Sequence, residues 1–183
     1  MEDEDEIVPD AENFVVASLP EDHKFYTLVG RVASEWSQLE HICDMTIWEL
    51  CNINSLYAAC ITSQIMGVGP RCKVILNLLR VRGFDAETVK RYRRLMADSY
   101  EWADRRARII HDPWYLEAGE NKPAQFRAMP CADQRFGFCE VKEDEILGLL
   151  KRIKDLQITA HNLLVELRDS LSASPETPDP ESI

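Results

Sequence analysis

Arginine and histidine stand close together at the end of one basic, helix-forming stretch, Tyr100–Tyr115, which reads YEWADRRARIIHDPWY. Arg106 lies five residues before His111, and Arg105 lies six before it. A guanidinium can stabilise phosphate charge through two parallel hydrogen bonds, and an imidazole titrates near neutral pH, so it can move protons. Asp112-Pro113 should end the helix directly after the histidine. Such a pair could act on a phosphodiester without a metal.

Arg106 also breaks the polar pattern of its helix. The apolar stripe expected over residues 85–111 recurs at three- and four-residue steps, and Arg106 falls on that stripe, whereas Arg105 continues the polar side. A guanidinium among core positions is costly unless it is paired or faces a cleft or an interface. Arg106 therefore either pairs with an acid, for which Glu40 is our candidate, or belongs to a working site. Glu40 could otherwise be an ordinary exposed acid.

His111 has a structural alternative, because an imidazolium at a helix C-terminus is favourable in itself. Other chemistries find no support in the sequence. There is no Glu-x-x-His motif of di-iron bundles, no H-E-x-x-H, no Walker-type glycine loop and no nucleophile elbow. The six cysteines lie far apart without C-x-x-C, so a zinc site is not expected.

The formal net charge of −11 belongs to the tails. Residues 1–22 hold nine acids and residues 174–183 hold three, with no Lys or Arg in either, so both are expected to be disordered. The body, residues 23–173, keeps 20 acids and 21 bases. Within it, residues 71–111 carry eleven Lys/Arg against five acids. That surplus indicates either a nucleic-acid footprint or a solvated helix face with i,i+4 pairs, such as Glu87–Arg91 and Glu101–Arg105.

The cellular setting follows from what the sequence lacks. It has no signal-peptide pattern and no apolar run near the ~20 residues that a membrane span needs. We therefore expect a cytoplasmic protein without membrane attachment, whose cysteines are reduced and mostly fill the core.

Hydrophobic periodicity predicts an all-α fold: an antiparallel bundle of four or five helices in a single domain, residues 23–173. A small β-hairpin or meander is expected before the last helix, because the helical period disappears over residues 114–141. The helices are expected at residues 23–51, 54–66, 70–81, 85–111 and 142–172, with caps at Asn54 or Ser55 and at Asp85 and with breaks at Gly67 and Gly83.

Two of these segments together resemble the HEPN superfamily (higher eukaryotes and prokaryotes nucleotide-binding domain). They are GRVASEWSQLEHICDMTIWEL in the first helix and RRARIIHDPW at the end of the penultimate long helix. The family signature is an arginine, four to six residues, and then a histidine. The resemblance covers about residues 24–115. It implies an all-α bundle, usually a homodimer whose signature helices meet across the two-fold axis, and many members cleave RNA without a metal.

Carried over, Arg106 matches the signature arginine and His111 the histidine, and Arg105 matches at the longer spacing. The polar residue that commonly follows the arginine is Ala107 here. The toxin subgroup with tyrosine two residues after the histidine is not matched, because that position is Pro113 and Tyr115 comes two residues later.

The resulting expectation is a metal-independent endoribonuclease, toxin- or defence-type, acting on RNA as a homodimer without a cofactor. The residue roles are catalytic for Arg106, His111 and Arg105, RNA-binding for Arg108, Arg94 and Tyr115, and orienting for Glu40 and Asp112. The alternative is a catalytically weak or inactive dimeric binding module. An antitoxin-type protein partner is compatible with both.

Overall fold

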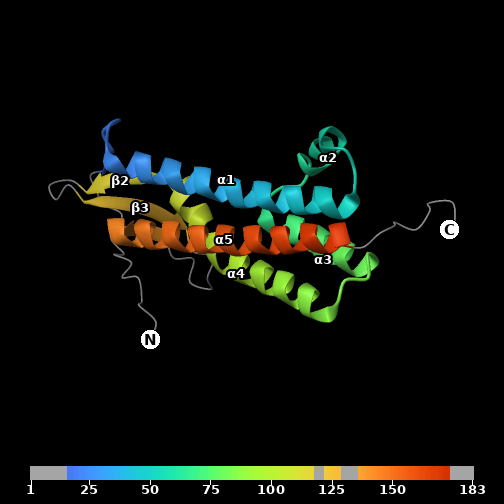
Figure 1. The fold of residues 1–183 in the computed structure, drawn as a ribbon. Helices are drawn as coiled ribbons and strands as arrows, with labels where there is room; N and C mark the ends of the chain where they lie inside the picture. Colours follow the sequence, from blue (N-terminus) through green and yellow to red (C-terminus); the bar gives the residue numbers. More distant parts are fainter. Residues whose placement is uncertain (1–15, 118–121, 129–135, 174–183) are drawn as a thin grey trace. The chain divides into compact units, whose positions relative to one another are not determined.

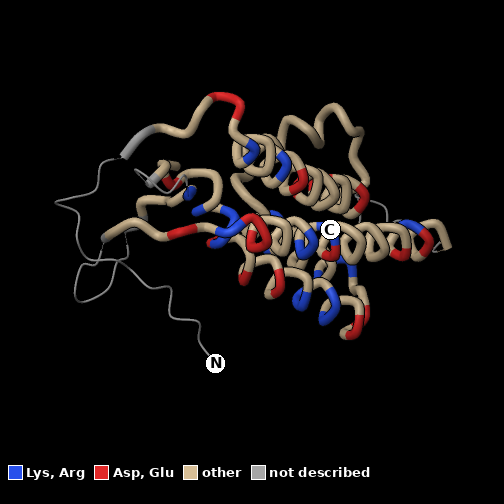
Figure 2. The backbone as a smooth tube through the Cα atoms, turned by 90° about the vertical axis from the view of Figure 1, so that its left-hand side faces the viewer, with Lys and Arg blue, Asp and Glu red and all other residues tan. Residues whose placement is uncertain are grey.

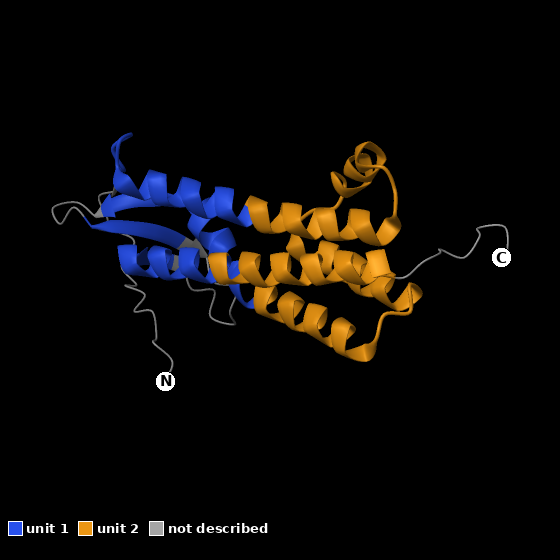
Figure 3. Ribbon diagram, viewed as in Figure 1, with its two compact units in different colours: residues 1–36, 101–153 blue, residues 37–100, 154–183 orange. Residues whose placement is uncertain are grey.

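The computed structural model describes residues 16–117, 122–128 and 136–173 (Figure 1). These residues form mostly helix, with a small antiparallel sheet before the last helix, as the sequence predicts. The chain divides into two compact units: unit 1 comprises residues 1–36 and 101–153, and unit 2 comprises residues 37–100 and 154–183 (Figure 3). Three long helices contribute to both units, namely α1 (Lys24–Cys51), α4 (Ala86–His111) and α5 (Glu143–Ala173).

The sheet belongs to unit 1 and has the order β1-β2-β3-β4, with every neighbouring pair antiparallel. Its strands are β1 (Val16–Ser18), β2 (Trp114–Glu117), β3 (Pro123–Ala128) and β4 (Phe136–Glu140). The meander predicted over residues 114–141 is confirmed in β2, β3 and β4.

Strand β1 corrects the predicted boundary of the acidic tail, which we placed at residue 22. Val16–Ser18 pairs with β2 in the register Val16↔Glu117 and Ser18↔Tyr115, and the neighbouring Leu19 is buried. Three residues are too short to show a strand period, and their partner lies about a hundred residues later, so the local sequence carries no signal for this pairing. Residues 1–15 and 174–183 lie outside the described residues.

The core of unit 1 is built from one face of each helix and the sheet beside them. Buried positions of α1 and of α5 recur at three- and four-residue steps, the helical period that the sequence shows. They are Phe25, Leu28, Val32 and Trp36 on α1 and Ile146, Leu149, Leu150 and Ile153 on α5. The Phe25 ring lies 5.2 Å from that of Trp114 on β2. The starts of α1 and α5 are joined by an ion pair between Lys24 and Glu143.

Unit 2 adds two shorter helices, α2 (Ser55–Thr62) and α3 (Val68–Val81). Asn54 caps α2, because its side-chain oxygen accepts a hydrogen bond from Leu56 N–H at 2.9 Å. Helix α2 ends four residues before the predicted Met66. The chain tightens there into i→i+3 hydrogen bonds, including Ile65 N–H to the Thr62 carbonyl at 3.0 Å. Gly67, with a φ of 80°, then redirects the backbone into α3.

The N-terminus of α4 is capped by the residue that the sequence predicts. Asp85 caps it, accepting hydrogen bonds from the backbone N–H groups of Glu87 (2.9 Å) and Thr88 (3.0 Å) and from the Thr88 hydroxyl (2.7 Å). Gly83, with a φ of 73°, separates α3 from this cap.

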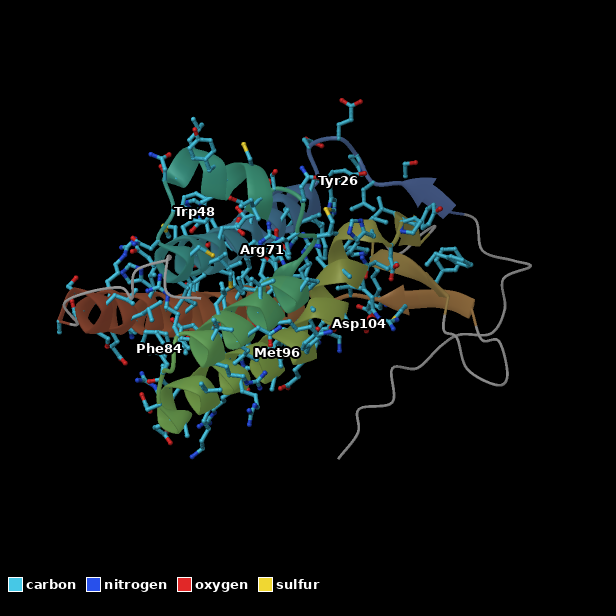
Figure 4. The ribbon with its side chains drawn as sticks, turned by 90° about the vertical axis from the view of Figure 1, so that its right-hand side faces the viewer. Tyr26, Trp48, Arg71, Phe84, Met96 and Asp104 are labelled. Atoms are coloured by element: carbon cyan, nitrogen blue, oxygen red, sulfur yellow. The ribbon has the colours of Figure 1, made fainter. Side chains whose placement is uncertain are left out.

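A buried arginine connects α1 with α3 inside unit 2 (Figure 4). Arg71 is 7% exposed. Its Nε donates to Asp44 Oδ1 at 2.7 Å and its Nη2 to Asp44 Oδ2 at 3.4 Å. Its Nη1 donates to the Gly67 carbonyl at 3.1 Å. The charge is therefore compensated by a two-point ion pair and a backbone hydrogen bond.

The described cysteines are free thiols, and Cys43, Cys72 and Cys139 are buried, as core-filling cysteines should be. A hydrogen bond with Cys72, together with burial, raises the pKa of Cys43 well above its ordinary value, so this thiol stays protonated. Cys51 is half-buried, and Cys60 is exposed on α2. Cys131 lies outside the described residues.

Across the helices of the described ranges, none combines the length and the apolar character that crossing a membrane requires.

Candidate functional site

Arg106 faces a tryptophan. Its guanidinium lies over the Trp36 ring of α1, 5.7 Å from the ring centre, and the residue is half-buried. An arginine over an indole face is stabilised by roughly 0.5–2 kcal/mol, more as water is excluded. The placement on the apolar stripe, inferred from periodicity, is confirmed. The sequence analysis did not predict that Trp36 neighbours Arg106, although Trp36 belongs to the apolar stripe of α1.

His111 is the last residue of α4 and is exposed. Two carbonyls of the last helical turn, those of Arg108 and Ile109, accept hydrogen bonds from residues beyond the helix. Trp114 Nε1–H donates to the Ile109 carbonyl at 3.0 Å, while Gln125 Nε2–H and the Asp112 N–H donate to the Arg108 carbonyl at 3.1 and 3.0 Å. Trp114 of β2 and Gln125 of β3 thus bind two of the carbonyls at the helix end, and the favourable interaction of a His111 imidazolium with this C-terminus stays an alternative.

Arg106 and His111 point in different directions from one helix. At ~100° and 1.5 Å per residue, their directions differ by roughly 140° and their positions along the axis by about 7.5 Å. The direction of Arg108 from the helix axis differs from that of His111 by only roughly 60°, so these two side chains lie on nearly the same side of α4. A single chain thus does not bring the guanidinium of Arg106 and the imidazole of His111 onto one face of α4.

Two arginines flank a second tryptophan in unit 1. The Arg105 guanidinium lies 6.0 Å from the Trp102 ring centre, and the Arg152 guanidinium of α5 lies 5.7 Å from it. Arg105 is also 3.3 Å from Glu145 and keeps 49% of its side chain exposed. Arg152 is exposed, and within the described part of the chain no acid lies within ion-pair distance of it. We name Trp102, Arg105 and Arg152 the tryptophan–arginine cluster.

The sequence reading missed Trp102 and Arg152. Trp102 carries a local signal, since it precedes Arg105 by one helical turn. Arg152 carries none, because its neighbourhood depends on how the first turns of α5 pack against α4 within unit 1.

Three arginines of α4, namely Arg91, Arg105 and Arg108, form ion pairs. Arg108 donates to Asp104 at 3.1 Å, one turn earlier, and its side chain is 31% exposed. The two pairs expected within the helix are not the ones formed among the described residues. Arg91 binds Glu166 of α5, with Nη2 to Oε1 at 2.9 Å, and Arg105 binds Glu145 of the same helix. Figure 2 shows acidic and basic positions interspersed along the helices.

The other predicted site residues divide between the units. Tyr115 lies on β2 in unit 1, half-buried, with its ring 5.6 Å from and edge-on to Phe138. Asp112 is half-buried directly after α4. Arg94 is exposed on α4 in unit 2, and Glu40 lies in unit 2, 4.0 Å from Arg71. Glu40 therefore has a core-facing arginine of another helix nearby, as one alternative predicted. Its pairing with Arg106 stays a prediction.

Within the described ranges, no group of three or more His, Cys, Asp or Glu side chains is arranged to hold a metal ion.

Comparisons of the chain with family models, with curated proteins and with solved structures find no match.

Proposed function

We propose that the protein is a metal-independent endoribonuclease of the HEPN type, in which two chains bring their α4 ends together around one RNA phosphate. The observation that supports it best is the exposed His111. It ends a helix whose Arg108 and Ile109 carbonyls have other partners, and three arginines lie within its final two turns. An exposed histidine at a helix end is accessible to a substrate for proton transfer.

The two-chain arrangement follows from the geometry of α4. Because the directions of Arg106 and His111 differ by roughly 140° on the helix, a site using both side chains needs a second copy to supply one of them. A two-fold axis at the helix end also supplies a second imidazole. One histidine can then accept a proton while the other donates one, which a single histidine cannot do in one step.

The reaction is a transesterification within the RNA. One His111 removes the proton of a ribose 2′-OH, whose oxygen attacks the adjacent phosphorus. The bond from phosphorus to the 5′-oxygen breaks, and the His111 of the second copy protonates the departing oxygen. The products are a 2′,3′-cyclic phosphate and a 5′-OH end. Arg105 and Arg106 stabilise the charge that develops on the phosphorane oxygens.

RNA is held by arginines around the catalytic group. Arg105 and Arg152 are exposed and oriented by Trp102, which reduces the freedom that each guanidinium loses on binding phosphate. Arg108 adds further positive charge in unit 1, and Arg94 is proposed as an RNA-binding residue of unit 2. Tyr115 contributes least, because its ring is half-buried against Phe138.

The same proposal includes five further features of the protein. They are an antiparallel HEPN-like bundle, a homodimer, a cytoplasmic setting, a toxin- or defence-type role and an antitoxin-type protein partner. The high proportion of helical residues and the long amphipathic helices support the bundle.

A second candidate is an inactive dimeric binding module. Two observations favour it: Arg106 is half-buried and engaged with Trp36, and Ala107 replaces the polar residue usual in the family. In this case Arg106 serves the packing of α1 against α4 inside unit 1, and the arginines bind RNA without cleaving it.

The test compares two histidine variants on single-stranded RNA. His111→Ala is expected to lose at least about 100-fold in cleavage rate, the contribution of one general acid–base group. His161→Ala is the matched control, since His161 is also an exposed helical histidine and should keep full activity. EDTA should not inhibit cleavage, and circular dichroism should show equal helical content in both variants.

His111→Ala activity equal to wild type would remove His111 from the reaction. Wild-type protein that binds RNA but leaves it intact would favour the binding module instead.

A further inference from the structure

Helices α3 and α4 lie side by side and antiparallel within unit 2. Residues 82–85 join the end of α3 to the start of α4. At the other end, a Cβ atom added to Gly69 would lie 2.5 Å from the Tyr100 hydroxyl oxygen, so the start of α3 lies against the Tyr100 ring. That ring is 48% exposed. Arg71 and Met96 mark the two helices in Figure 4.

The helical period places three cations along this junction. Lys73 and Arg80 follow Gly69 by four and eleven residues, so at ~100° per residue their directions differ from that of Gly69 by roughly 40° and 20°. Arg93 precedes Tyr100 by seven residues, and its direction differs by roughly 20°. Because Gly69 and Tyr100 face each other, the three cations lie on the sides of α3 and α4 that meet. We name Lys73, Arg80, Arg93 and Tyr100 the α3–α4 seam.

The cations of the α3–α4 seam are exposed and are not neutralised by acids. Over residues 16–117, 122–128 and 136–173, no carboxylate lies within ion-pair distance of Lys73, Arg80 or Arg93. Other cations of α4 are paired, as Arg91 is with Glu166. Three like charges on one strip of surface repel one another and attract a polyanion.

The spacing along the seam suits a single strand of nucleic acid. At a rise of 1.5 Å per residue, Lys73 lies about 6 Å from Tyr100 along the helix axes. Arg93 follows at about 10 Å and Arg80 at about 16 Å. A strand carries one phosphate about every 3.4 Å, so these cations extend over about five nucleotides. The exposed Tyr100 ring offers a stacking surface to an unpaired base, which an acidic polypeptide does not have.

We propose that the α3–α4 seam binds single-stranded RNA, with its three cations against phosphates and one base stacked on Tyr100. The seam goes beyond the proposed cleavage at the end of α4, because it belongs to unit 2 and contains none of the residues assigned to the reaction. The seam holds the strand and takes no part in the transesterification.

The first experiment measures the binding of a fluorescent 2′-O-methyl RNA of about ten nucleotides, a usual site size for single strands. This strand has no 2′-OH nucleophile, so its binding is measured whether or not the protein cleaves RNA. The triple variant Lys73→Gln/Arg80→Gln/Arg93→Gln should weaken binding at least about tenfold near physiological salt. It should also flatten the dependence of log binding constant on log salt by about 2, since each phosphate contact contributes ~0.7.

The matched control removes the same charge from exposed positions of unit 1, in the variant Arg31→Gln/Lys142→Gln/Lys151→Gln. This variant should keep the salt dependence of the wild type. Circular dichroism should show equal helical content in both triple variants, because all six side chains are exposed. Equal flattening in both would overturn the proposal, because binding would then follow net charge and not position.

The second experiment keeps the proposal testable if the triple variant of the seam fails to fold. Tyr100→Ala should weaken binding about tenfold, the effect of losing one stacked base, and should leave the salt dependence unchanged. Tyr100→Phe keeps the ring and should bind like wild type. Equal affinities of Tyr100→Ala and Tyr100→Phe would contradict stacking on the seam. Displacement of the strand by poly-glutamate at equal charge concentration would identify an acidic polypeptide as the occupant and would also overturn the proposal.

Discussion

Removing the Asp44 carboxylate should destabilise the protein far more than breaking a surface ion pair. The side chains of Arg71 and Asp44 are 9% and 14% exposed, so Asp44→Ala leaves a buried guanidinium with only the Gly67 carbonyl and Glu40, at 4.0 Å, nearby. Breaking one side of a buried pair costs about 3–5 kcal/mol. Because Glu40 compensates part of the charge, we expect ~3 kcal/mol, which corresponds to roughly 6–12 °C in Tm for a chain of this size.

Thermal unfolding followed by circular dichroism measures this effect, with Glu49→Ala as the control. That substitution breaks the Arg168–Glu49 pair, whose N–O distance is also 2.7 Å but whose side chains are 45% and 36% exposed. Its cost should stay below about 1 kcal/mol. The double variant Asp44→Leu/Arg71→Met removes both charges and should be more stable than Asp44→Ala. Equal Tm shifts for Asp44→Ala and Glu49→Ala would refute the reasoning.

Two further predictions concern RNA binding and pH. Arg152→Gln should flatten the dependence of log binding constant on log salt by about 0.7, one phosphate contact to a single strand, whereas the neighbouring Lys151→Gln should not. Equal slopes for both would remove Arg152 from the RNA surface. The hydrogen bond from the Thr88 hydroxyl lowers the pKa of Asp85, so the stability contributed by this carboxylate is present above its unfolded pKa and lost as pH falls through the folded one. Asp85→Ala should therefore lower Tm at pH 7, and the difference from wild type should narrow below about pH 4. A difference in Tm that does not change with pH would show that the charge of Asp85 plays no part.

The helices were predictable because their signals are local. The apolar period places α1 and α5 within about a residue of their bounds, and the Asn54 and Asp85 caps and the turns at Gly67 and Gly83 act on their immediate neighbours. The position of Arg106 on the buried side of α4 followed from the same period.

What the sequence could not supply are contacts between distant segments. Arg71 binds Asp44, which lies 27 residues away in the sequence, and Arg91 binds Glu166, which lies 75 residues away. The packing of the helices, and not the spacing within one helix, therefore determines which acid each arginine binds. The same holds for Arg152 beside Trp102, and for β1, whose partner strand begins almost a hundred residues later. The roles of His111, Arg105 and Arg106 in cleavage stay predictions.

The measurement closest to the central claim mixes wild-type and His111→Ala chains in equal amounts, lets the subunits exchange, and compares RNA cleavage with that of the same total amount of wild type. If one phosphate is attacked by the histidines of two chains, only dimers with two wild-type chains are active, and the rate should fall to about one quarter. A rate of about one half would mean that each chain acts alone, and would contradict a site shared across the two-fold axis.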